Sequence, residues 1–209
     1  MWYPILITVL TGYMLGNLNG AIAVSSLMKD DVRSHGSGNA GLTNFIRSYG
    51  AGKSLFVILI DAVKTVLACL AGGLILGGEG KEALGTALGG LGVMLGHCFP
   101  ATQGFKGGKG ILSGLFVALS CDWRIGVMIL GIFAVFYFMT WYVSLGSVLA
   151  SVGFAAGFVI WHHNDLPVMI CGIAMGCLAL FMHRSNIVRL LKGNERKTNL
   201  FSKKGTAEK

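Results

Sequence analysis

Long apolar segments occupy most of this chain, and only three short polar runs separate them. The apolar segments lie at 4–28, 54–78, 84–99, 110–121, 125–140, 142–161 and 166–182. A bilayer core about 30 Å thick is crossed by about 20 helical residues. Charged residues make up 12% of the chain, whereas soluble domains have about 25%. We therefore predict an all-α polytopic membrane protein with about seven transmembrane helices.

The number of crossings depends on the middle of the chain. The segment 110–121 is short for a spanning helix, so a short tilted helix or a re-entrant element is the alternative there. Five crossings also fit the charge pattern if two of the segments between 110 and 161 do not span. The five cysteines show no ligand spacing, and we expect neither a metal site nor a disulfide framework.

Basic residues indicate how the chain is oriented in the membrane. They gather in the loops 29–53 and 100–110 and in the tail from residue 183, where eight Lys and Arg stand against two Glu. The opposite loops, 79–83 and 162–165, contain a single Lys. Since cytoplasmic loops carry the excess of Lys and Arg, we predict an external amino terminus and a cytoplasmic carboxyl terminus. All three polar runs then face the cytoplasm.

The first polar run, residues 36–50, is rich in glycine and in side-chain donors. Glycines before a helix start expose backbone N–H groups, and the start of a helix favours an anion. The run therefore predicts a phosphate site, and a tight interhelical loop with an interfacial arginine is the alternative. Its candidate ligands are Gly36, Ser37, Gly38, Asn39, Thr43, Asn44 and Arg47.

The second polar run combines paired glycines with lysines: Lys106, Gly107, Gly108 and Lys109. Glycine lets the backbone approach a ligand closely, and lysine supplies a point charge for phosphate. The spacing of a Walker A loop is absent, which disfavours nucleotide hydrolysis. The alternative is a basic surface loop on anionic lipid. Upstream, His97 is expected to support this loop, and acid–base chemistry and helix capping are the alternatives.

The third polar run places His183, Asn186 and Arg189 at helical spacings of three residues. They are predicted to share one helix face, although a basic amphipathic helix lying on the bilayer has the same pattern. Inside the second apolar segment, Asp61 and Lys64 are spaced for mutual pairing. That pair is either a structural ion pair or a support for the site.

Several enzyme classes lack their sequence signatures here. No HExxH, GxSxG or HxxxxD pattern occurs, and the few carboxylates are too scattered for a glycosidase pair. The histidines form no obvious zinc cluster. We expect membrane lipids as partners of this chain and no nucleic acid.

The three runs together resemble the bacterial acyl-phosphate-dependent glycerol-3-phosphate acyltransferases. The resemblance extends over about residues 10–195, and Leu42 and the stretch 101–104 depart mildly from the family pattern. The stretch 17–19 in the first apolar segment is given no role. The matching residues are Gly36 to Asn39, Thr43, Asn44, Arg47, Gly96, His97, Pro100, Phe105 to Gly110, His183, Arg184, Asn186, Ile187, Arg189 and Leu190.

The resemblance implies an acyltransferase domain over 1–195 with a basic cytoplasmic tail over 196–209. It implies a multi-pass enzyme of the bacterial inner membrane whose active site faces the cytoplasm. Acyl phosphate from an upstream enzyme is expected to acylate the sn-1 hydroxyl of glycerol 3-phosphate, giving lysophosphatidic acid and phosphate, the first step of phospholipid synthesis. No cofactor or metal is expected. The residues expected to be catalytic are Ser37, Arg47, Lys109 and His183.

Two other classes of function remain open from the sequence. A phosphate or organophosphate transporter requires polar residues along a path through the bilayer, and few are present beyond Asp61 and Lys64. A non-enzymatic membrane subunit with lipid-binding loops would tolerate Lys-to-Arg and His-to-Ala changes. A purified-protein assay with acyl phosphate and glycerol 3-phosphate separates these classes from an acyltransferase.

Overall fold

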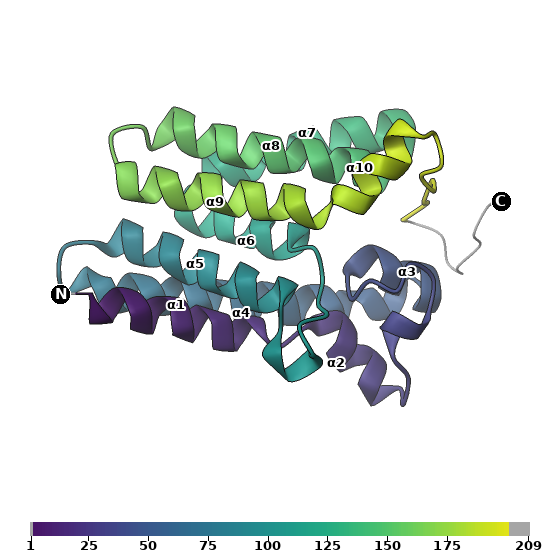
Figure 1. Ribbon diagram of the computed structural model, residues 1–209, viewed down its shortest axis with the longest axis horizontal. Coiled ribbons are helices and arrows are strands. Elements are labelled where there is room, and N and C mark those ends of the chain that lie inside the picture. Colours follow the sequence, from purple (N-terminus) through teal and green to yellow (C-terminus); the bar gives the residue numbers. More distant parts are fainter. Residues whose placement is uncertain (1, 201–209) are drawn as a thin grey trace.

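The computed structural model describes residues 2–200, and every regular element within them is helical. All seven predicted apolar segments form helices, and the all-α membrane fold is confirmed. Figure 1 shows the helices in chain order. They are α1 (Tyr3–Gly16), α2 (Gly20–Leu27), η1 (Val32–Ser34), α3 (Leu42–Tyr49), α4 (Ala51–Gly77), α5 (Glu82–Cys98), η2 (Ala101–Gln103), α6 (Ile111–Cys121), α7 (Trp123–Thr140), α8 (Val143–Trp161), α9 (Leu166–Met182) and α10 (Arg184–Leu191).

Among the described residues, five segments are long and apolar enough to cross a membrane. They are Tyr3–Leu27, Ala51–Gly77, Glu82–Gln103, Trp123–Thr140 and Val143–Trp161. Helices α9 and α10 together pass the same test but are bent by 56°, so they give a sixth candidate. Helix α6 is apolar and short, as its sequence indicated. A total of seven crossings remains a prediction.

The helices form two packed groups joined by α6. Helices α1, α4 and α5 contact one another, and α8 packs between α7 and α9. Helix α6 contacts α4, α5 and α7, and it lies between the two groups in Figure 1. Contacts between α5 and α9 close the bundle. The apolar interior therefore runs between the groups along the bundle axis.

Glycines allow α1 and α5 to pack backbone against backbone. Gly12 and Gly16 stand one turn apart on α1, the small-xxx-small pattern of close membrane helix pairs. A Cβ atom on Gly12 would lie 2.5 Å from the carbonyl oxygen of Gly89, and one on Gly16 would lie 2.4 Å from that of Val93. Neither distance is compatible with a side chain. The abundance of glycine in the sequence is thus explained in part by this interface.

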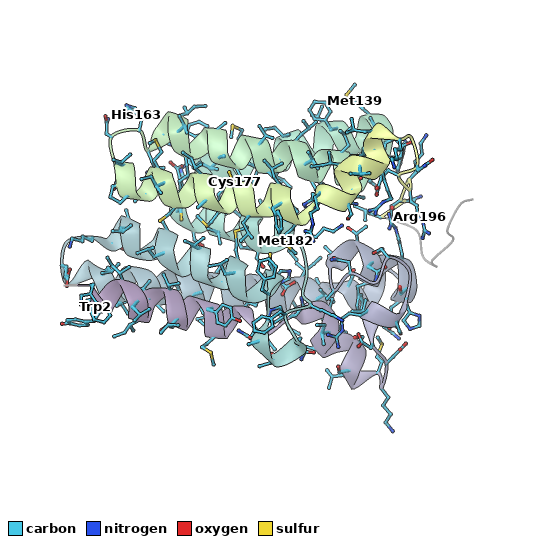
Figure 2. The ribbon with its side chains drawn as sticks, viewed as in Figure 1. Trp2, Met139, His163, Cys177, Met182 and Arg196 are labelled. Carbon is cyan, nitrogen blue, oxygen red and sulfur yellow. The ribbon has the colours of Figure 1, made fainter. Side chains whose placement is uncertain are left out.

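The polar runs all lie at one end of the bundle, which we call the loop end. Figure 1 shows α3, α10 and the connection between α5 and α6 at this end. Figure 2 shows Arg196 there as well, with Trp2 and His163 at the opposite end. The charge pattern predicted that these loops share one side of the membrane. Their position at one end of the bundle agrees with that prediction.

The break between α1 and α2 connects parts of the loop end. The Asn19 side chain accepts a bond from the Ile22 amide (3.1 Å) and donates one to the Ala40 carbonyl oxygen (3.0 Å). Asn17 Oδ1 accepts a bond from the amide of Thr102, at 3.2 Å. The stretch 17–19 was assigned no role from the sequence, whereas these bonds join the first two polar loops to α1 and α2.

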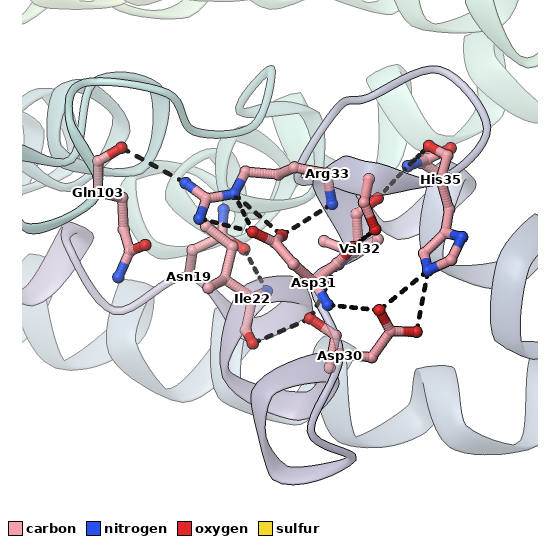
Figure 3. A network of polar contacts seen from close by, with 11 residues as sticks. Asn19, Ile22, Asp30, Asp31, Val32, Arg33, His35 and Gln103 are labelled. Carbon is pink, nitrogen blue, oxygen red and sulfur yellow. Dashed lines mark hydrogen bonds and ion pairs between the residues drawn. The ribbon is translucent and has the colours of Figure 1, made fainter.

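A network of polar contacts fixes the loop before α3 (Figure 3). Arg33 pairs with Asp31 at 2.8 Å, and its Nη1 atom donates to the carbonyl oxygen of Gln103 at 3.4 Å. Asp30 accepts bonds from the Asp31 amide and contacts the His35 ring. The contact with His35 is the main cause that lowers the pKa of Asp30. The first loop is therefore fixed by contacts among its own residues and by one contact with the second loop.

Candidate functional site

The three polar runs meet at the mouth of one cavity. Its volume is about 440 Å³, within the range of small-molecule sites. At the loop end it is lined by polar and charged residues from three separate parts of the chain. These are Ser37, Asn39, Thr43, Asn44, Arg47, Lys109, His183, Asn186, Arg189, Glu195 and Arg196.

The same cavity continues between the helices into an apolar interior. There it is lined by side chains of α5, α6, α7, α8 and α9, together with three serines of α8, Ser144, Ser147 and Ser151. The apolar lining residues include Met94, Ile111, Leu115, Ile129, Leu130, Phe133, Phe154 and Met175. The cavity can therefore hold a molecule with a charged head and an apolar chain.

Asn44 shapes the first loop from within α3. Its Nδ2 atom donates to the carbonyl oxygens of Val32 (2.9 Å) and His35 (3.0 Å). Its Oδ1 atom accepts the Ser37 amide at 2.9 Å. We predicted Asn44 as a phosphate ligand, but the loop backbone already uses both of its amide hydrogens. It lines the cavity and holds Ser37 in place.

Glycine is required where this loop passes Asn44. Gly36 has φ +57°, and a Cβ atom on it would lie 2.4 Å from Asn44 Oδ1. Gly38 has φ +69°. Both are left-handed conformations that glycine adopts without strain. These two glycines shape the loop but are not among the residues that line the cavity.

The second loop wraps closely around the end of α5. The Gly108 amide donates to the His97 carbonyl oxygen at 3.0 Å. A Cβ atom on Gly108 would lie 2.2 Å from His97 Nε2, and one on Gly107 would lie 2.1 Å from the His97 carbonyl oxygen. We predicted both glycines as phosphate ligands, but the Gly108 N–H is engaged with His97. These contacts place His97 against the second loop, and its support of that loop stays a prediction.

The two lysines of this loop have different surroundings. Lys109 lines the cavity, and its ammonium group donates to Asn186 Oδ1. Lys106 is exposed and does not line the cavity. The structure therefore brings only one of the two predicted phosphate-binding lysines to the site.

The third run enters the site where α9 meets α10. His183 is buried, and its Nδ1 atom lies 2.8 Å from the Ala179 carbonyl oxygen, so Nδ1 carries the proton and Nε2 is the acceptor. Asn186 donates to Glu195 Oε1 at 3.1 Å, and Arg189 Nε donates to Glu195 Oε2 at 2.8 Å. The predicted common face of His183 and Asn186 is confirmed, since both line the cavity.

Cations outnumber carboxylates around this mouth. Both their mutual repulsion and their burial disfavour the charged forms of Lys109 and Arg47. Burial is the main cause that lowers the pKa of Lys109 to about 8, and the nearby Arg189 and Arg47 lower it further. Burial also lowers the pKa of Arg47. Glu195 opposes both shifts. A bound anion would relieve this repulsion, as expected for a phosphate site.

Asp61 and Lys64 of the second apolar segment pair with each other, as their spacing predicted, and a supporting role of the pair in the site stays a prediction. Lys64 Nζ lies 2.7 Å from Asp61 Oδ1, and both side chains are buried. The same ammonium group contacts His97 Nδ1 at 2.9 Å and donates to the Leu18 carbonyl oxygen at 2.6 Å. Asp61 and His97 both line the cavity. The pair thus links α4, the α1–α2 break and the end of α5.

Two features of the site carried no recognised signal in the sequence. Glu195 was assigned no role from the sequence, although its carboxylate joins Asn186 to Arg189. Residues 196–200 were assigned to a tail beyond the domain, but Thr198 is 6% exposed and bonded to the bundle. Residues 201–209 of that tail lie outside the described residues. Across residues 2–200, no group of three or more His, Cys, Asp or Glu is placed to hold a metal ion.

Comparison with known proteins gives the family. Residues 6–193 match the sequence model of the family Glycerol-3-phosphate acyltransferase. The chain belongs to this family. It is a glycerol-3-phosphate acyltransferase and an integral membrane enzyme, which confirms the predicted family and the coarser part of the predicted function.

Relatives of similar length support the assignment. The glycerol-3-phosphate acyltransferase of Finegoldia magna is 39% identical over 186 residues, covering 88% of this chain and 91% of that protein. The enzyme of Thermoanaerobacter pseudethanolicus is 37% identical and covers 91% of this chain and 94% of its own.

Solved structures agree with the fold of this acyltransferase. The glycerol 3-phosphate form of PlsY (YgiH), an integral membrane glycerol 3-phosphate acyltransferase, is 28% identical with a TM-score of 0.81. The match covers 93% of this chain and 96% of that one. The lysophosphatidic acid form of PlsY has a TM-score of 0.79.

Proposed function

We propose that this acyltransferase moves a fatty acyl group from an acyl phosphate to the sn-1 hydroxyl of glycerol 3-phosphate. The products are lysophosphatidic acid and inorganic phosphate. One observation carries the proposal: a single cavity joins a cationic mouth to an apolar interior between the helices. The solved relatives that bind glycerol 3-phosphate and lysophosphatidic acid support the choice of acceptor and product.

The charge of the mouth suits two phosphate groups. A phosphate monoester carries about −1.5 to −2 charge at pH 7, so two of them repel unless cations lie between or around them. Arg47, Lys109 and Arg189 line the mouth and come from α3, the connection between α5 and α6, and α10. The acyl chain lies in the apolar part, which leaves its phosphate at the mouth beside glycerol 3-phosphate.

The reaction then requires orientation and charge stabilisation rather than a covalent enzyme intermediate. The sn-1 oxygen attacks the acyl carbon and forms the ester bond. The bond from the acyl carbon to the phosphate oxygen breaks, and phosphate leaves as an anion. Lys109 and Arg47 stabilise the negative charge that develops on the acyl oxygen and the leaving phosphate. Phosphate is a stable leaving group, so strong acid catalysis is unnecessary.

The proton of the attacking hydroxyl has two acceptors in this proposal. One is a phosphate oxygen of a substrate. The other is His183 Nε2, because the bond from Nδ1 to the Ala179 carbonyl oxygen fixes the tautomer with a free Nε2 lone pair. The imidazole borders the cavity and is therefore within the reach of a bound hydroxyl.

Ser37 is the residue that an alternative covalent mechanism would use. It lines the cavity, and its amide is held by Asn44. Its neighbours at the mouth are mainly hydrogen-bond donors and cations. Such groups orient an anion better than they activate a nucleophile. Rapid quenching of the enzyme with labelled acyl phosphate should leave no label on Ser37. Acyl-Ser37 in the quenched protein would replace this mechanism by a two-step one.

The proposal also places the enzyme in the bacterial inner membrane with the loop end toward the cytoplasm. The excess of Lys and Arg at this end supports that orientation. There the site is open to soluble glycerol 3-phosphate, while acyl phosphate is supplied by an upstream enzyme. The reaction as written needs no cofactor.

The choice of donor is tested with the purified enzyme in vesicles. Acyl phosphate and glycerol 3-phosphate should give equal amounts of lysophosphatidic acid and phosphate, with the acyl group on the sn-1 oxygen. Acyl-CoA in place of acyl phosphate should give no product above background. Two results would overturn the proposal while leaving the family assignment intact. One is turnover with acyl-CoA but not with acyl phosphate, and the other is acylation of the sn-2 oxygen.

A further inference from the structure

Residues 194–200 form a strap that folds back across the loop end. The strap follows α10 after Gly193, whose φ of +69° turns the chain. It includes Glu195, Arg196 and Leu200, all of which line the cavity. The family model ends at residue 193, before the strap begins. The strap is therefore a part of the cavity wall that the family match does not cover.

Hydrogen bonds to the backbone of the strap attach it to the end of α7. The phenol of Tyr137, which is 2% exposed, donates to the Thr198 carbonyl oxygen at 3.1 Å. It also accepts a bond from the Leu200 amide at 3.0 Å. The Thr198 amide donates to the Trp141 carbonyl oxygen at 3.0 Å. A buried tyrosine with both of its hydrogen-bonding roles used on one segment holds that segment in a fixed place.

The hydroxyl of Thr198 reaches across to Arg47 of α3. Thr198 Oγ1 accepts from Arg47 Nε at 2.8 Å and also from Arg47 Nη2. A guanidinium has five N–H donors in a rigid fork. These two bonds fix its plane and leave the Nη1 donors and one Nη2 donor for an anion. The strap therefore joins α7 to α3 through the arginine at the mouth.

We propose that the strap is part of the active site and that Thr198 is a positioning residue for Arg47. Thr198 orients the guanidinium toward the bound phosphate, and Tyr137 keeps Thr198 in place. The inference rests on the proposed function, in which Arg47 binds a phosphate group. It assigns a specific task to a segment that composition alone identifies only as a basic tail.

The test compares Thr198→Val, which keeps the shape and backbone bonds, with Thr198→Ser, which keeps the hydroxyl. Loss of a hydrogen bond to a charged group is expected to lower kcat/KM about tenfold in Thr198→Val. The loss should include a higher KM for a phosphate substrate, and Thr198→Ser should restore activity to within about twofold. Ser120→Ala is the control, because the Ser120 hydroxyl bonds to the Phe116 carbonyl oxygen within α6, away from the strap. It should leave activity unchanged.

A double-mutant cycle shows whether Thr198 acts through Arg47. Thr198→Val should have no further effect on kcat/KM in an Arg47→Ala background. Tyr137→Phe, which loosens the anchor only, should give a smaller loss in the same direction. An effect of Thr198→Val that is equally large without Arg47 would overturn the proposal. So would a lower Tm with an unchanged KM, because that result indicates a merely structural role.

Binding of inorganic phosphate separates this inference from the choice of donor. If the wild-type enzyme shows no turnover with acyl phosphate, the donor proposal fails and phosphate binding still tests the strap. Thr198→Val should then weaken phosphate binding, measured by calorimetry, by about tenfold. Equal Kd values for Thr198→Val and the wild type would overturn the role of the strap, whichever acyl donor the enzyme uses.

Discussion

Lys106 and Lys109 belong to one glycine-rich loop, yet the structure gives them different surroundings. Gly107 and Gly108 turn the chain around the end of α5, which brings Lys109 to the cavity and leaves Lys106 exposed. Their residue type and spacing in the sequence do not distinguish them. At the scale of a residue, the fold decides which cation can contact a substrate.

The lowered pKa of Lys109 predicts a pH dependence of activity. With a pKa of about 8, the ammonium group is charged below pH 8 and loses its proton as the pH rises above it. Phosphate binding needs the charged form, so kcat/KM should fall as the pH rises through about 8. The profile of kcat/KM reports groups of the free enzyme, which makes it the right measurement.

Lys109→Arg provides the control for this pH profile. An arginine stays charged up to pH values above 12, so the variant should lose the decline near pH 8, whatever its activity at neutral pH. A variant that keeps the same decline would show that another group titrates there. Lys109 would then not be the cation that the pH profile reports.

Residue types in the sequence predicted the cations and donors of the site because charge and donor capacity belong to the side chain itself. The use of each group could not be predicted in the same way. The hydrogens of the Asn44 amide and of Gly108 N–H are taken by nearby carbonyl oxygens. Glu195 and Thr198 depend on chain folding after α10, which no local pattern describes.

Among the elements, α4 carries the buried Asp61–Lys64 pair, which contacts the α1–α2 break and the end of α5. The predicted segment 54–78 corresponds closely to α4 (Ala51–Gly77), because a long apolar run in a membrane has only the helix open to it. The break between α1 and α2 was not predicted. Its carbonyl oxygen at Leu18 is satisfied by Lys64, a tertiary contact that hydropathy does not report.

Removing one partner of this pair should destabilise the enzyme more than removing both. Asp61→Asn leaves a buried ammonium group without a carboxylate, which costs about 3–5 kcal/mol in buried pairs. Adding Lys64→Met removes that charge and should recover part of the loss. Thermal unfolding in detergent of Asp61→Asn, Lys64→Met, the double variant and the wild type measures the coupling between the two residues. A double variant as unstable as the sum of the two single ones would contradict the pairing.

For the whole molecule, the essential feature is that one end differs from the other. The loop end holds the cationic cavity, and the opposite end carries the connections α4–α5 and α8–α9. The charge asymmetry that predicts the orientation was readable from the sequence because it depends on loop composition alone. The meeting of three loops in one cavity depends on helix packing, which only a structure shows.

The proposed orientation, with the loop end toward the cytoplasm, predicts which positions a membrane-impermeant thiol reagent reaches. A cysteine in place of exposed His163, at the opposite end, should react in intact cells. Gln103→Cys, at the loop end, should react only after the cells are permeabilised. The unsubstituted protein is the control, because its own cysteines must give no signal. The reverse pattern would place the active site outside the cytoplasm.

The claim that one cationic cavity holds both reactants is tested most directly by comparing Lys109→Met with Lys106→Met. Both variants remove one lysine from the same loop, so a general attraction of lipid to basic loops would affect them alike. We predict that kcat/KM for acyl transfer falls about 100-fold or more in Lys109→Met and stays within about twofold in Lys106→Met. Similar values for the two variants would contradict the account.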